Sequence, residues 1–81
     1  MTDVTYGRLD ELLRSLGFVM GNSEQGTRVY QHEISSAMVI LPNKSDRDVV
    51  PAHHMVGTRM ILEAFGIMDP PEFTSRLQRA S

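Results

Sequence analysis

Three histidines, His32, His53 and His54, are the side chains in this sequence that could exchange a proton near neutral pH. His53 and His54 are neighbours, and on a helix their side chains point about 100° apart, which makes joint ligation of one ion difficult. In a strand, His32 and Glu33 would point to opposite faces and form no pair. We therefore favour surface histidines over a metal site. The sequence contains no glycine-rich phosphate loop and no nucleophile motif, so we also expect no cofactor.

Four cations in the middle of the chain are candidates for contacts with RNA phosphates. The net charge is −2, which argues against tight non-specific binding to a polyanion. Residues 25–60 nevertheless carry a net charge of about +1, although Asp46 and Asp48 weaken the potential around one of the cations. Charge alone favours a mixed, solvated surface, and RNA contacts are the alternative. The candidates are Arg28, Lys44, Arg47 and Arg59.

The composition is that of one globular domain of 81 residues, 41% hydrophobic and 22% charged. Cysteine is absent, which excludes disulfides, thiolate zinc sites and cysteine nucleophiles. The longest apolar run, residues 37–41, is far shorter than the roughly 20 residues that a membrane-spanning helix needs. Because no secretory signal is evident either, we expect a cytoplasmic protein with no membrane partner.

The first of the elements that must position these residues is a helix at residues 5–16. Leucines at spacings of three and four place one apolar stripe on it. Thr5 suits the N-cap, and Gly17 suits a left-handed position after the last turn. The leucines of the stripe are Leu9, Leu12, Leu13 and Leu16.

Three short, strand-prone segments follow at residues 18–20, 27–32 and 37–41, separated by turn-rich residues. Such spacing predicts an antiparallel meander. Pro42 cannot donate a ladder hydrogen bond, so the third strand ends there or lies at an edge.

Two further helices complete the prediction. Pro51 suits a helix start, Gly66 a helix stop, and a stripe that includes Leu62 and Phe65 lies between them. The run Asp69-Pro70-Pro71-Glu72 predicts a short terminal helix at about 70–79. We therefore expect one α+β domain over residues 1–81, in the order α-β-β-β-α, with its core at about 5–67. Two helices cover one face of a three-stranded antiparallel sheet, and the short helix is added at the end. The expected core residues are Leu9, Leu12, Leu13, Leu16, Phe18, Tyr30, Val39, Leu41, Ile61, Leu62 and Phe65.

The strands do not alternate between apolar and polar residues, as strands with one wet face do. If Phe18, Tyr30 and Val39 face the helices, a second apolar set faces outward. We interpret this set as an interface. The alternative is that residues 70–81 cover it. The outward set is Val19, Val29, Met38 and Ile40.

Several runs along the chain have the order and spacing of a known family. They are Leu12-Leu13 with Leu16-Gly17-Phe18, the run from Gly26 to His32, Val39-Ile40-Leu41-Pro42, and the run from Arg59 to Ile67. In these runs the chain resembles the HicA (YcfA-like) toxins of bacterial toxin–antitoxin pairs. The resemblance implies a fold like a double-stranded-RNA-binding domain, which contacts RNA through shape and phosphates.

HicA toxins are messenger-RNA ribonucleases whose activity is attributed to a histidine in a Gly-Ser-His run. Here Thr27 occupies the matching position, or Arg28 if the alignment is made on the glycine. Neither side chain exchanges a proton near neutral pH, so we expect a poor ribonuclease. The resemblance thus implies a HicA-like RNA-binding domain that is impaired as an enzyme. The alternative is a protein-interaction module without RNA chemistry, which dimerises or binds an antitoxin-like partner through its sheet face.

Overall fold

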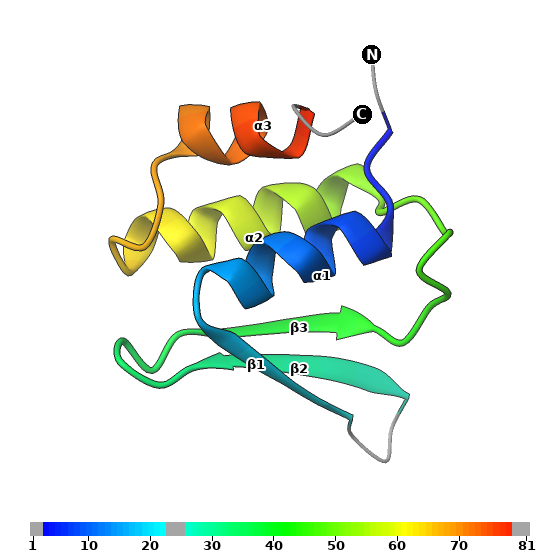
Figure 1. Cartoon of the computed structure of the whole chain (residues 1–81), viewed down its shortest axis with the longest axis horizontal. Coiled ribbons are helices and arrows are strands. Elements are labelled where there is room, and N and C mark those ends of the chain that lie inside the picture. Colours follow the sequence, from blue (N-terminus) through cyan, green and yellow to red (C-terminus); the bar gives the residue numbers. More distant parts are fainter. Residues whose placement is uncertain (1–2, 23–25, 79–81) are drawn as a thin grey trace.

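A three-stranded antiparallel sheet with helices on one side makes up the structure, a computed structural model that describes residues 3–22 and 26–78. The α+β class and the order α-β-β-β-α, followed by a terminal helix, are as the sequence predicts (Figure 1). Within these residues, no helix is long and apolar enough to cross a membrane. The elements are α1 (Tyr6–Ser15), β1 (Phe18–Asn22), β2 (Thr27–His32), β3 (Met38–Pro42), α2 (Ala52–Ala64) and α3 (Pro70–Gln78).

Helix α1 has the caps that the sequence predicts. The Thr5 hydroxyl accepts a hydrogen bond from the Arg8 main-chain N–H at 3.2 Å, which satisfies one of the free donors at the helix start. Gly17, with φ of 99°, turns the chain out of the helix and into β1. The buried stripe also includes Tyr6, which precedes the periodic leucines and was missed for that reason. Leu16 is only partly buried because it stands at the C-cap.

The sheet has the order β1-β2-β3, and its inner face forms the core with the helices. Tyr30 on the central strand lies between Met20 of β1 and Val39 of β3. Phe18 and Leu41 share this inner face with them and are buried as predicted. Because side chains alternate along each strand, the intervening residues point away from the helices.

Helix α2 buries Thr58 and Leu62 and packs against β3. Ile61 is partly buried against the core, whereas the prediction that Phe65 is buried is wrong, since 49% of its surface is exposed. The physical reason is that α2 ends at Ala64, so Phe65 is the C-cap residue and leaves the helical stripe.

Helix α3 lies on the side of α1 and α2 that faces away from the sheet (Figure 1). It buries Phe73 and Leu77, so the core extends beyond residue 67, where the sequence placed its end. The alternative in which residues 70–81 cover the outer sheet face is therefore wrong for residues 70–78. Residues 79–81 lie outside the described part of the chain.

Leu62 has no exposed surface, so its truncation tests the packing of α2 on the sheet. We expect Leu62→Ala to lower the free energy of unfolding by about 2–5 kcal/mol through lost burial and a cavity. Met60→Ala is the matched control on the same helix, because 59% of Met60 is exposed and its truncation should change stability little. Urea unfolding of both variants measures the difference, and equal midpoints would contradict this packing.

Candidate functional site

The outer face of the sheet gathers the four apolar residues that the sequence placed together. Val19 is 62% exposed, Met38 42% and Ile40 56%, while Val29 is half-buried. The strand register puts Val29 opposite Ile40. We use "outer face" for the strand residues that point away from the helices. They are Val19, Gly21, Thr27, Val29, Gln31, Met38, Ile40 and Pro42.

This outer face carries no charged side chain. In the described structure the three helices lie on the opposite side of the sheet (Figure 1). Ile34, in the turn between β2 and β3, adds a further apolar side chain that is 93% exposed. A largely apolar surface without a cation favours contact with a protein over contact with a phosphate.

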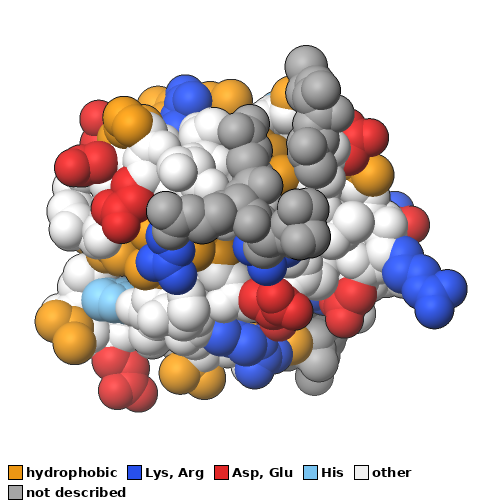
Figure 2. Space-filling model, turned by 45° about the horizontal axis from the view of Figure 1, so that its top comes forward, with side chains coloured by type: hydrophobic (Ala, Val, Ile, Leu, Met, Phe, Trp, Pro, Cys, Tyr) orange, Lys and Arg blue, Asp and Glu red, His pale blue; other side chains and the backbone are white. Residues whose placement is uncertain are grey.

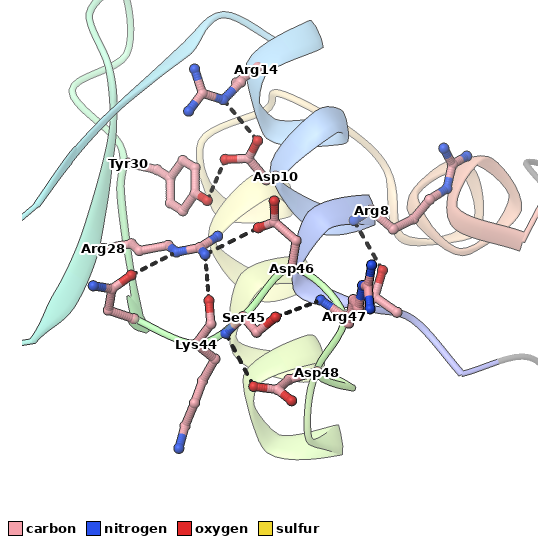
Figure 3. A network of polar contacts seen from close by, with 12 residues as sticks. Arg8, Asp10, Arg14, Arg28, Tyr30, Lys44, Ser45, Asp46, Arg47 and Asp48 are labelled. Carbon is pink, nitrogen blue, oxygen red and sulfur yellow. Dashed lines mark hydrogen bonds and ion pairs between the residues drawn. The ribbon is translucent and has the colours of Figure 1, made fainter.

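Arg28, a phosphate candidate, is buried at the inner face of β2. Its guanidinium donates to the Asn43 side chain at 3.3 Å, to the Lys44 carbonyl and to an Asp46 carboxylate oxygen at 3.2 Å (Figure 3). These contacts compensate the loss of hydration that burial of a charge requires. Arg28 thereby fastens the 43–48 loop to the sheet, and its guanidinium is occupied by the protein itself.

Lys44 and Arg47 project from the same loop and are exposed. The acids around them have partners: Asp46 pairs with Arg28, and Asp48 accepts the Ser45 N–H at 3.1 Å. Figure 2 shows Lys and Arg side chains interleaved with Asp and Glu, which is a mixed surface. Arg59 lies on α2 and is half-buried, so it does not belong to the group of cations on the 43–48 loop.

The start of α1 contacts the 43–48 loop through its main chain. The N–H of Tyr6 donates to the Asp48 carbonyl at 2.9 Å, and that of Gly7 donates to the Asp46 carbonyl at 3.0 Å. These donors are the ones that a helix start could offer to a phosphate. Because the loop already occupies them, this helix end holds the loop in place.

The His32 ring forms hydrogen bonds both to the end of α1 and to the turn after β2. Its Nε2–H donates to the Leu16 carbonyl at 3.1 Å, because a carbonyl can only accept. Nδ1 accepts the Ser35 main-chain N–H at 3.3 Å, so it carries no hydrogen and also accepts from the Ser35 hydroxyl at 2.8 Å. The ring also lies against Phe18, with the ring centres 5.0 Å apart. The surroundings of His32 are thus those of a structural residue.

His53 and His54 stand at the start of α2 with their ring centres 4.2 Å apart. Burial, and then the neighbouring His53, lowers the pKa of His54 below its usual value. Among the described residues, no group of three histidine, cysteine, aspartate or glutamate side chains could hold a metal ion.

Thr27, one of the two residues that the resemblance aligns with the toxin histidine, starts β2 on the outer face. His53 and His54 belong to the helix layer beyond the inner face, so the sheet separates them from the Thr27 side chain. His32 lies at the far end of β2 on the inner face. The described structure therefore brings no imidazole to this position.

A chain of polar contacts that runs from the inner face of the sheet to the surface of α1 was not found from the sequence. The Tyr30 hydroxyl donates to Asp10 at 2.7 Å, and Arg14 donates to the second carboxylate oxygen at 2.8 Å (Figure 3). Burial, and then this bond to Asp10, raises the pKa of Tyr30 to about 12, although Arg28 acts in the opposite direction. The sequence feature that could have predicted this contact is a tyrosine on the inward side of a strand, because a buried hydroxyl needs a hydrogen-bond partner.

Fold and surface together define a small α+β domain with an open, uncharged sheet face. No protein-family model matches the chain, and no curated protein or solved structure matches it significantly. The functional assignment therefore depends on the geometry of the surface.

Gly7 allows the close approach of α1 to the 43–48 loop. A Cβ at Gly7 would lie 2.9 Å from the Asp46 Cβ and 3.2 Å from its carbonyl oxygen. We expect Gly7→Ala to lower the free energy of unfolding by about 1 kcal/mol or more, despite the better helix propensity of alanine. Gly57→Ala is the matched control, since nothing lies within 4 Å of its Cβ position, and it should raise stability by about 0.5–1 kcal/mol. Denaturant unfolding should give opposite signs, and the same sign for both would contradict the contact.

The raised pKa of Tyr30, about 12, makes stability depend on pH in alkali. The folded state holds this proton more tightly than the unfolded chain, whose tyrosine pKa is near 10. The contribution to the free energy of unfolding is thus fully present below about pH 10 and is lost as pH rises through about 12. Tyr30→Phe should lose stability at neutral pH and show a smaller further loss between pH 10 and 12. Urea unfolding across this range measures both, and an unchanged slope would contradict the assignment.

Proposed function

We propose that this chain is a small HicA-like protein-interaction module that binds a partner protein through the outer face of its sheet. The observation that carries the proposal is the exposure of Val19, Met38 and Ile40 on a face that bears no charge. Covering such side chains removes apolar surface from water, which is the main driving force of most protein association.

The size of the outer face limits how the partner binds. Three strands about 4.8 Å apart and five residues long, at about 3.4 Å per residue, span roughly 10 by 17 Å. A standard interface buries about 800 Å² on each partner. The partner must therefore also contact residues beyond the strands. The exposed Ile34 in the adjoining turn extends the apolar surface in this direction.

The resemblance to HicA toxins supports this proposal through the kind of partner it implies. In that family the partner is an antitoxin protein, and the observed order α-β-β-β-α is the one that the resemblance implies. The placement of Thr27 and Arg28 favours binding over RNA cleavage. In the described structure no histidine side chain lies beside Thr27, and the guanidinium of Arg28 is hydrogen-bonded to the 43–48 loop.

RNA binding is the second candidate, and one observation favours it. The 43–48 loop is fastened at Arg28 and at the start of α1, so it holds the exposed Lys44 and Arg47 in place. Phosphate contacts of this kind need no base readout. Two exposed cations beside partnered acids make a weak site, which is why the outer face ranks first.

Photo-crosslinking tests the proposed function in the cell that produces the protein. A photoreactive amino acid in place of Ile40 should yield an adduct with one protein, which mass spectrometry identifies. The same amino acid in place of the exposed Glu11 on α1 should not yield that adduct. With the identified protein purified, Ile40→Lys should weaken binding at least about tenfold, or about 1.4 kcal/mol. Met60→Lys, the same change at an exposed apolar residue of α2, should leave binding unchanged.

Both lysine variants should unfold at the temperature of the unchanged protein. Adducts from Glu11 but not from Ile40 would contradict the proposal. Adducts with RNA in place of protein would favour the second candidate, provided that Lys44→Glu combined with Arg47→Glu abolishes retention on RNA.

A further inference from the structure

Strand β1 is an outer strand of the sheet whose free edge can be derived from the ladder. The His32 N–H donates to the Ala37 carbonyl, so the main-chain groups of His32, and by alternation those of Tyr30 and Arg28, point toward β3. On β1, Val19 and Gly21 then bond to β2, whereas Phe18, Met20 and Asn22 direct their N–H and C=O groups away from the sheet. Among the described residues, none of these three has a main-chain partner outside the sheet.

Within residues 3–22 and 26–78, the free edge of β1 lacks the devices that normally prevent pairing with another chain. Such devices are proline, lysine, a bulge or a covering element. The sequence of β1 is Phe-Val-Met-Gly-Asn, without charge or proline, and its register with β2 is unbroken. The opposite edge differs, because β3 ends in Pro42, which has no N–H to donate to another chain. Pairing with a second chain is therefore favoured at β1.

We propose that β1 pairs antiparallel with β1 of a second copy of this chain, about a two-fold axis at Met20. In this register Met20 faces its own copy, and Phe18 faces Asn22 of the second copy. Every outward N–H of Phe18, Met20 and Asn22 then meets a carbonyl, so the edge is complementary to itself.

The outer-face residues of β1, Val19 and Gly21, fit this register. Val19 of one copy lies opposite Gly21 of the other on the outer face, and nothing lies within 4 Å of the Cβ position of Gly21, so Val19 has room. A two-fold axis brings each side chain near its own copy, where like charges would repel. Since β1 has no charged residue, this repulsion does not arise.

Pairing at β1 joins two sheets into one and makes their outer faces continuous. The apolar surface that each chain exposes at Val19 and Ile40 is thereby doubled. The dimer does not depend on the proposed function, because the edge hydrogen bonds form whether or not a partner covers the outer face.

Sedimentation equilibrium over a micromolar to millimolar range tests the dimer with the full chain. The unchanged protein should reach the dimer mass. Met20→Pro removes one outward N–H without removing a ladder bond to β2, and it should raise the dimer dissociation constant at least tenfold. Met20→Ala, which keeps the N–H, should remain dimeric. Ile40→Lys should also remain dimeric while losing the partner, so failure of the dimer and failure of the proposed function are distinguished.

Amide exchange and cysteine trapping keep the test decisive if Met20→Pro does not fold. In the unchanged protein, exchange of the Met20 amide should slow as concentration rises. Because the chain has no cysteine, Met20→Cys should form a disulfide with its own copy under mild oxidation, and Ile40→Cys, two strands away, should not. A monomer at every concentration, or a disulfide through Ile40→Cys alone, would overturn the proposal.

Discussion

The packing of all three helices on one side of the sheet is the constraint from which the rest of the structure follows. Helix α3 lies on α1 and α2 and buries Phe73 and Leu77 there, so it adds to the core without reaching the strands. Within the described residues, nothing is left to cover the second face of the sheet. A small domain has little apolar surface to spare for burial. The apolar residues on that second face stay exposed, so the monomer does not gain the free energy that their burial would contribute.

Burial of Arg28 explains why the predicted cations do not form one phosphate site. If Tyr30 points inward, Arg28 must also point inward, because the two residues are two positions apart on the same strand. A buried guanidinium needs hydrogen-bond acceptors, and the 43–48 loop supplies them through Asn43, Lys44 and Asp46. The contact takes Arg28 out of any external site and at the same time orders the loop that carries Lys44 and Arg47.

Features of the structure that depend on neighbouring residues could be predicted from the sequence, whereas features that depend on distant contacts could not. The leucine spacing of α1 and its caps could be predicted because these signals act within a few residues. The outward set on the strands could be predicted because strand alternation is regular. The exposure of Phe65 and the docking of α3 could not, since both depend on where α2 ends and which distant surface receives the last helix. The Asp10–Tyr30 bond, 20 residues apart, is likewise set by the tertiary structure.

Contacts at both ends of α1 hold the sheet in a fixed relation to the helices. At the start of α1, the amides of Tyr6 and Gly7 bind the 43–48 loop, which Arg28 fastens to β2. At its end, the Leu16 carbonyl binds His32, whose other ring nitrogen closes the turn between β2 and β3. A surface held in this way loses little conformational freedom when a second molecule covers it, and this lowers the entropic cost of association. Polar contacts on the inner side of the sheet thus fix the shape of the uncharged outer face.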